Sequence, residues 1–286
     1  MPPNNNNLTS ALSRQMRRLR EQVDRIDLRM LQLLQQRTKL SGQIGKMKRR
    51  HGAVIYVPER ERELVARLVR LSKGEPSARA VAALYREILS SSRAAQGQAP
   101  IGLLRASASV VLPASRACFG ACDQFSIQRT WAELARSLGT GALSLALLTG
   151  DDLLRALGTQ RRRSDFLRRL TVAGDFLPAF DAKTPPAGRI FIVTPRGNGA
   201  SVEADRIVIL IECKSAVNGI KSLLHSMPDF SIHAEQSTRR VTLARLTPAR
   251  PVDGVGAMSR LLAASKSAGV PVSILGIYAG TKDYAG

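Results

Sequence analysis

The sequence has few aromatic residues, few cysteines and no long apolar run. Aromatic side chains make up 4% of the 286 residues, so any core has to be mainly aliphatic. The cysteines, Cys118, Cys122 and Cys213, are odd in number and predict no disulfide framework. No apolar stretch could cross a bilayer, and the opening residues MPPNNNNL lack the pattern of a secretion signal. We expect a cytoplasmic protein with a disordered tail over residues 1–8.

Residues that bind metals, and acidic residues in general, are also scarce. Cys118 and Cys122 have no histidine near them in the sequence, and His51, His225 and His233 are scattered, so we expect no metal site. Lys and Arg number 43 against 22 Asp and Glu, which gives a net charge of +21. This charge is spread along the chain and comes without a zinc-finger or aromatic RNA-binding signature. We therefore expect no nucleic-acid partner.

The most informative stretch is free of proline and runs from about Ser10 to Arg50. Apolar residues recur in it with the three-to-four spacing of a helix that has one buried face. They are Leu12, Met16, Leu19, Val23, Ile26, Met30, Leu33, Leu40 and Ile44. The same pattern asks for apolar residues near positions 37 and 48 but meets Arg37 and Lys48. Because a buried cation is costly unless it meets an anion, these residues predict a pocket for a small acidic molecule.

Distances along this helix indicate how such a pocket is completed. With a rise of ~1.5 Å per residue, Arg37 and Lys48 lie about 16 Å apart and could hold opposite ends of one metabolite. Arg20 adjoins the same apolar stripe but lies about 25 Å from Arg37, too far to share a small ligand within one chain. We therefore predict an intertwined homodimer in which each pocket borrows Arg20 from the partner chain.

The chain divides into three segments, which predict a multidomain protein. Residues 9–96 form an all-α domain of three helices, with the second helix starting at Pro58 and the third capped by Ser77. Residues 101–200 alternate between strand-like and helical patterns, which is typical of an α/β region. Its expected strands are Ile101–Leu104, Val110–Leu112, Leu143–Leu148 and Ile190–Val193. Residues 205–280 have the order βαββαβ of an α+β ferredoxin-like module.

Several short motifs in the helical segment follow one another in a recognisable order. They are Leu19-Arg20-Glu21, Ile26-Asp27, Gln36-Arg37, Ile44-Gly45-Lys46-Met47-Lys48, Pro58-Glu59-Arg60-Glu61, Tyr85-Arg86-Glu87-Ile88 and Ser92-Arg93-Ala94-Ala95-Gln96. Together they resemble the all-helical chorismate mutase domain that begins bifunctional chorismate mutase/prephenate dehydratase proteins. The resemblance implies the rearrangement of chorismate to prephenate in phenylalanine and tyrosine biosynthesis. That reaction needs no nucleophile and no cofactor, and it depends on conformer selection and electrostatic stabilisation.

The resemblance also implies roles for residues at the matching positions. Arg37 and the partner's Arg20 would bind the two carboxylates of chorismate, which suits the guanidinium fork. Lys48 and Gln96 would donate hydrogen bonds to the ether oxygen of the breaking bond. Ser92 would contact a carboxylate. Taken singly, each residue could also be an ordinary surface or helix-end group, and it is their combination that points to a site.

Two further residues of the second helix belong to the implied site. Glu61 would hold the ring hydroxyl of chorismate, and Arg60 would orient the ligand or its neighbours. In one respect this sequence departs from the family, whose members commonly have an aspartate just before the Pro-Glu-Arg-Glu run, where this chain has Val57. Since that aspartate helps to recognise the hydroxyl, its loss leaves Glu61 working alone and predicts weaker chorismate binding.

The rest of the chain resembles the domains that follow the mutase in the bifunctional proteins, in degenerate form. Residues 101–200 are shorter than a prephenate dehydratase, and Gly188-Arg189-Ile190-Phe191 replaces its Thr-Arg-Phe motif, so we expect dehydratase activity to be lost. Residues 205–280 resemble a regulatory ACT domain. The effector motifs match poorly, with Asn218-Gly219-Ile220 and Glu235-Gln236-Ser237-Thr238 in their places. A packing or dimerising role is favoured over regulation by an aromatic amino acid.

Two alternatives remain open from the sequence. Isochorismate pyruvate lyase has a similar fold and uses the same kind of cationic pocket. The second alternative is a protein without enzymatic activity, derived from a mutase, that senses a ligand or binds a partner. The number of site residues that are still in place favours the mutase over this alternative.

Overall fold

The computed structural model describes residues 5–177, 188–196, 203–204, 206–212, 216–238 and 241–278. Helix α1 (Asn5–Arg50) covers the predicted long helix and starts before it. Residues 5–8 are therefore helical and the predicted tail is wrong there, while residues 1–4 lie outside the described residues. The helix ends where Lys48, Arg49 and Arg50 supply positive charge to its last turn and Gly52 turns the chain with a φ of 63°.

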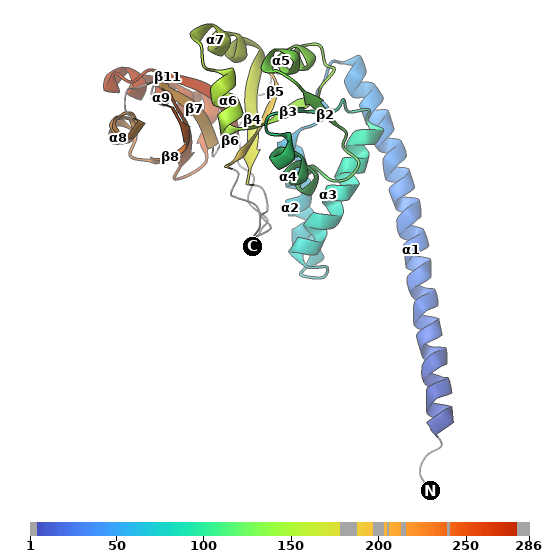
Figure 1. Ribbon diagram of the computed structural model, residues 1–286. Helices are drawn as coiled ribbons and strands as arrows, with labels where there is room; N and C mark the ends of the chain where they lie inside the picture. The colour runs from blue at the N-terminus through green and yellow to red at the C-terminus, as the bar shows by residue number, and fades with distance from the viewer. Residues whose placement is uncertain are drawn as a thin grey trace.

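Helices α2 (Pro58–Ser72) and α3 (Ala78–Ala95) complete the predicted three-helix region. Pro58 is the first residue of α2, and Lys73 ends that helix in the left-handed conformation. The Ser77 hydroxyl accepts a hydrogen bond from the backbone N–H of Ala80 at 3.3 Å and so caps α3. Helix α3 packs against both α1 and α2, while the N-terminal half of α1 projects away from the rest of the chain (Figure 1).

The middle of the chain forms a five-stranded mixed sheet in the order β2-β1-β3-β5-β4. Strands β2, β1 and β3 are parallel, and β5 pairs antiparallel with β3 and β4. The strands are β1 (Ile101–Leu104), β2 (Phe125–Gln128), β3 (Leu145–Thr149), β4 (Leu170–Phe176) and β5 (Ile190–Pro195). The helices between them are α4 (Ala108–Phe119), α5 (Trp131–Gly139), α6 (Gly150–Ala156) and α7 (Gln160–Arg169).

One strand predicted for this region is wrong. Residues Val110–Leu112 lie in helix α4. The buried side of α4 includes Ala108, Val111 and Ala114, which is helical spacing, while Val110 is exposed. A short apolar run of this kind does not by its own pattern distinguish a strand from a buried helix.

The last part of the chain has the predicted element order βαββαβ. Its sheet is antiparallel with the order β11-β7-β9-β8. The strands are β7 (Arg206–Glu212), β8 (Phe230–Ser237), β9 (Val241–Pro248) and β11 (Val272–Tyr278), and the helices are α8 (Ala216–Ser226) and α9 (Gly254–Ala268). Two short strands, β6 (Glu203–Ala204) and β10 (Val252–Asp253), pair separately. No helix among the described residues is long and apolar enough to span a membrane.

The two sheets share one hydrophobic core. Val172 of β4 and Phe166 of α7 belong to the same buried cluster as Leu210, Leu243 and Leu275 of the second sheet. Strand β11 comes so close to β4 that a Cβ built on its glycine, Gly276, would lie 2.0 Å from the carbonyl oxygen of Val172. The predicted segments 101–200 and 205–280 are therefore packed together as one body.

Candidate active site

The first part of the site joins α1 to α3. The half-buried Arg37 side chain donates from Nη1 to the carbonyl oxygen of Ile88 at 3.3 Å and, in a short contact, to Oγ of Ser92. The Ser92 hydroxyl is buried and donates to the same Ile88 carbonyl at 2.7 Å. Two of the predicted carboxylate-binding residues are thus in contact, and the guanidinium is held by acceptors of the neighbouring helix.

Lys48 forms the second part, near the C-terminal end of α1. Its Nζ donates to the carbonyl oxygen of Ile55 at 2.8 Å, in the loop that leads to α2. Partial burial lowers the pKa of Lys48, the positive charge of Arg60 lowers it further, and the negative charge of Glu61 opposes both effects. These electrostatic effects place Lys48, Arg60 and Glu61 in one neighbourhood. The Arg60 side chain itself is exposed.

Glu61 projects from the first turn of α2. Its Oε2 accepts a hydrogen bond from Nη1 of Arg93 at 2.5 Å. Burial raises the pKa of Glu61, and the Arg93 guanidinium works against that rise. Val57, at the position of the family's aspartate, is the N-cap of α2 and provides no side-chain cap.

Gln96 ends α3 at the point where α1 crosses it. The Gln96 side-chain Oε1 is buried and has no hydrogen-bond partner within the described part of the chain. Helix α1 approaches so closely that a Cβ on Gly45 would lie 2.4 Å from the carbonyl oxygen of Gln96, and Arg49 donates to that same oxygen. Gly45 therefore permits the crossing that brings Gln96 next to the Lys48 end of α1.

Arg20 does not join the other candidates within one chain. It is exposed on the projecting half of α1, together with the apolar residues of the predicted stripe. Leu19, Val23 and Ile26 are each 50–59% exposed, so the expectation that this stripe is buried is not met within a single chain. Arg37 and Lys48 are the partly covered cations of the stripe.

Sequence reasoning missed the most enclosed charged residue of the three helices. The Arg93 side chain on α3 is 3% exposed and binds both Glu61 and Asp123. Its guanidinium also lies 5.7 Å from the ring centroid of Tyr56 and 5.6 Å from that of Phe119, within cation–π distance. The sequence did contain a signal for Arg93, of the same kind as for Arg37: a charged residue at a position where the helix pattern expects an apolar one. Arg93 stands four residues after Leu89, where the apolar face of the helix would continue.

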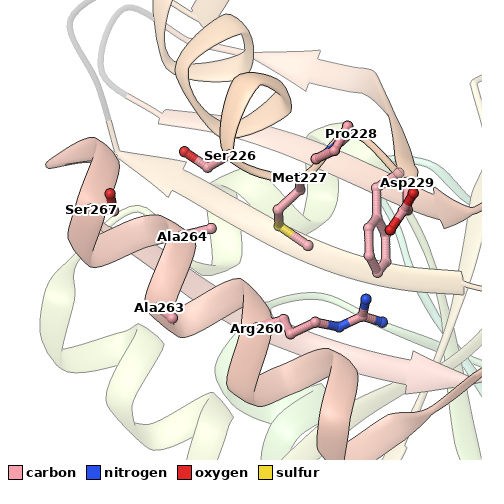
Figure 2. Close-up of a pocket in the computed structure, with 9 residues that line it drawn as sticks. Ser226, Met227, Pro228, Asp229, Arg260, Ala263, Ala264 and Ser267 are labelled. Carbon is pink, nitrogen blue, oxygen red and sulfur yellow. The ribbon is translucent and has the colours of Figure 1, made fainter.

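A hollow lies away from these residues. It encloses about 520 Å³ between α8, the start of β8 and α9, with Met227, Ala264 and Arg260 among its lining residues (Figure 2). The Arg260 guanidinium stands over the ring of Phe230 at 5.3 Å from its centroid. None of the predicted site residues lines this hollow, and the described residues contain no cluster of His, Cys, Asp and Glu that could hold a metal.

The three helices carry two partly covered cations, a partly buried glutamate and a glutamine whose Oε1 is buried, which is the set of groups that the sequence predicts for binding a small organic anion. The comparison with known families agrees, because residues 19–97 match the family chorismate mutase type II. This match covers the helical part of the chain.

Curated relatives match limited parts of the chain. A bifunctional chorismate mutase/prephenate dehydratase of Aquifex aeolicus is 34% identical over 110 residues, covering 37% of this chain and 30% of the relative. The T-protein of Haemophilus influenzae is 36% identical over 81 residues, covering 28% and 22%. The T-protein of Enterobacter agglomerans is 46% identical over 48 residues, covering 17% and 13%. The chain thus spans less than a third of the length of these curated relatives.

Among solved structures, a prephenate dehydratase from Streptococcus mutans overlaps 64% of this chain and 99% of its own. The TM-score is 0.40 at 12% sequence identity. A likeness of this strength defines neither the fold nor the function of the region that follows the mutase domain.

Proposed function

We propose that this protein is a chorismate mutase, which rearranges chorismate to prephenate. The carrying observation is that Arg37 and Lys48, the two cations on the apolar stripe of α1, are partly buried and donate hydrogen bonds to α3 and to the loop before α2. Chorismate carries two carboxylates and an ether oxygen that gains negative charge as its bond breaks. Cations held in place beforehand are suited to both tasks.

Catalysis would come from holding the reactive conformer. Arg37, already fixed by Ser92, would bind one carboxylate of the substrate bidentately. Lys48 would donate to the ether oxygen, and its partial burial strengthens that interaction because nearby water is reduced. Rotation of the Gln96 terminal amide by half a turn would exchange its free oxygen for the NH₂ group and supply a second donor.

Glu61 would bind the ring hydroxyl. One of its oxygens, Oε2, is occupied by Arg93, and the other is the acceptor that we assign to the substrate. Glu61 has to be ionised to accept this hydrogen bond, and the adjacent Arg93 guanidinium favours the ionised form. Arg60, exposed next to Lys48 and Glu61, would orient the ligand as it enters.

We infer that two chains pair through the exposed apolar stripe of α1. A row of half-exposed leucine, valine, isoleucine and methionine side chains along a projecting helix is a surface that a second copy can bury. In that homodimer the partner's Arg20 would bind the second carboxylate, which Arg20 of the same chain is too distant to reach.

Mixing two inactive variants tests the shared site. Arg20→Ala and Lys48→Ala remove residues that the proposal assigns to different chains of one pocket. Co-refolded in equal amounts, they should recover about a quarter of the wild-type activity, since half of the dimers then contain one intact site. No recovery, with the mixed dimer present, would contradict the borrowed arginine.

The activity itself is tested by chorismate depletion with identification of the product. Prephenate alone supports the proposal. Phenylpyruvate would show that the dehydratase persists, and release of pyruvate from isochorismate would identify the lyase. Absence of turnover would favour the sensor without enzymatic activity.

For the two C-terminal segments we propose packing roles. Arg189, in place of the dehydratase motif, forms ion pairs with Asp175 and Glu235, and Glu235 also pairs with Arg245. Gln236 donates to Asp151 of α6 at 2.6 Å. Residues that occupy the catalytic and effector motifs therefore connect the two sheets, as expected of an ACT-type module that no longer binds an effector. Calorimetric titration with phenylalanine and tyrosine should show no binding.

A further inference from the structure

The loop that follows α4 docks on the outer face of α3. The backbone N–H of Ala121 donates to Oε2 of Glu87 at 2.9 Å, and that of Cys122 donates to Oγ of Ser90 at 3.0 Å. Gly120, with a φ of 103°, brings the loop so near that a Cβ there would lie 2.7 Å from Cβ of Ser90. The α/β region is thus fastened to the same helix that carries Ser92 and Gln96.

Asp123, at the end of this loop, grips the Arg93 guanidinium with both oxygens. Nε of Arg93 donates to Oδ1 at 3.2 Å and Nη2 donates to Oδ2 at 2.8 Å. Oδ2 also accepts from Ser90 at 2.6 Å, and Oδ1 accepts from Gln98 at 3.3 Å. The Asp123 side chain is 2% exposed, so this is a buried, bidentate ion pair with every acceptor position used.

The remaining donors of Arg93 point in two directions. Nη2 also donates to the carbonyl oxygen of Phe119 at 2.6 Å, and Nη1 donates to Oε2 of Glu61. A planar guanidinium with one edge fixed by Asp123 and Phe119 has no freedom to rotate at its other edge. The position of Glu61 on α2 is therefore set by a carboxylate of the α/β region, through one intervening arginine.

We propose that Asp123 is a positioning residue of the mutase site, which holds Arg93 so that Arg93 fixes the free oxygen of Glu61 toward the ring hydroxyl of the substrate. This inference rests on the proposed function. It adds a residue from outside the helical domain and makes the α/β region part of the mutase site. It also gives a physical account of how Glu61 can work with Val57 in place of an aspartate, because Arg93 supplies the orientation.

The arrangement also stabilises the docked loop, so the test has to separate positioning from docking. Asp123→Asn keeps the size of the side chain but turns one of its acceptors into a donor that faces the guanidinium. Arg93→Lys keeps the positive charge but not the fork. Glu87→Gln is the matched control, because Glu87 accepts from the same loop without a hydrogen bond to Arg93.

Wild-type protein is first assayed for prephenate formation, and its failure to form prephenate would reject the proposed function before any variant is made. With an active wild type, Asp123→Asn and Arg93→Lys should each raise the KM for chorismate about tenfold, the equivalent of one charged hydrogen bond, while kcat changes little. Glu87→Gln should leave KM unchanged. Melting temperatures of all variants are measured alongside.

The pH dependence of kcat/KM provides a second test, because a change in loop docking alone would not shift it. Arg93→Gln removes the charge that favours ionised Glu61, so the acidic limb of kcat/KM should shift to higher pH, whereas Arg93→Lys should leave that limb in place. Wild-type KM in Asp123→Asn, with only a lower melting temperature, would overturn the inference. Equal rises of KM in Asp123→Asn and Glu87→Gln would overturn it as well, since docking would then explain both.

Discussion

The three-helix region and the two sheets use their residues in opposite ways. Among the described side chains of residues 12–97, Val81 is the one buried apolar residue, while the sheets and their helices bury aliphatic and aromatic side chains throughout. Charged residues differ too. In the helices, Arg37 and Lys48 contact neutral acceptors, whereas Asp175, Arg189 and Glu235 neutralise one another between the sheets.

We infer from this difference that the sheets contribute mainly stability and that the helices contribute the proposed ligand binding. The helical region leaves its apolar stripe exposed, and its Arg37 and Lys48 donate to neutral acceptors, so under the proposed function a second chain and an anionic substrate complete it. Between the sheets, Asp175, Arg189, Glu235 and Arg245 are already paired with one another, so these four residues are expected to contribute to packing. The comparison predicts that substitutions in the helices affect activity and association, and that those between the sheets affect stability.

The largest expected effect is on turnover. Lys48→Ala removes a donor aimed at the ether oxygen and should lower kcat about 10²–10³-fold. Lys46→Ala, an exposed lysine of the same helix, is the control and should be neutral. Steady-state kinetics measure both, and thermal unfolding checks that the fold is intact. A Lys48→Ala enzyme with normal kcat would remove the basis of the proposed mechanism.

The next effect is on association. Val23→Asp places a charge in the exposed apolar stripe of α1, which would be buried in the homodimer, and the cost of several kcal/mol should yield monomers without activity. Gln22→Asp adds the same charge to the neighbouring exposed position and should leave dimers. Size-exclusion chromatography with light scattering gives the masses. Fully active Val23→Asp monomers would contradict the proposal that each site uses residues of two chains.

The activity should fall at both low and high pH. Glu61 has to be ionised and its pKa is raised, so activity is lost as the pH falls through that raised value. Lys48 has to be protonated and its pKa is lowered, so activity is lost as the pH rises through that lowered value. Glu61→Gln should abolish the acidic limb of kcat/KM, while Glu63→Gln, exposed on the same helix, should keep it. An unchanged acidic limb in Glu61→Gln would assign that limb to another group.

Between the sheets the expected effect is on stability alone. The buried Tyr278 hydroxyl of β11 donates to Oδ1 of Asp175 in β4 at 2.8 Å. Tyr278→Phe should therefore cost about 1–3 kcal/mol of unfolding free energy, since a buried acceptor loses a partner. Ser259→Ala removes an exposed hydroxyl as the control. Urea denaturation measures the unfolding free energy of both variants. A drop in kcat for Tyr278→Phe would contradict the proposal that the sheets contribute stability and the helices activity.

The smallest effect concerns Val57. Val57→Asp restores the family's carboxylate at the N-cap of α2, so it should lower the KM for chorismate and add about 0.5–2 kcal/mol of stability by capping. Val54→Asp introduces the same charge into the exposed loop before α2, away from the cap, and should do neither. An unchanged or higher KM in Val57→Asp would show that an aspartate at this position does not improve chorismate binding.

The sequence predicted what depends on local pattern. The bounds of α2, the Ser77 cap and the βαββαβ order follow from capping residues and periodicity. Val110–Leu112 was wrong because three apolar residues carry no period of their own. The contact between Arg37 and Ser92 agrees with their predicted common site, while their roles toward chorismate stay predictions.

What the sequence did not predict depends on contacts between distant segments. Arg93 lies among the matched motifs, but its importance comes from Asp123, thirty residues later on a loop whose docking no local pattern encodes. The ion pairs of Arg189 with Asp175 and Glu235 likewise depend on how the two sheets face each other. For the exposed stripe of α1 the situation is the opposite. Its apolar pattern is visible in the sequence, but the surface that would bury it belongs to a second chain in the proposed homodimer.

The near-contact between Gly276 and Val172 has a practical consequence. The two sheets pack so closely at this point that no side chain fits between them. A polypeptide cut near residue 200 would therefore expose a large hydrophobic surface on each fragment. Calorimetry on the intact chain should accordingly record a single melting event for everything beyond residue 101, and expression of either half alone should give insoluble material.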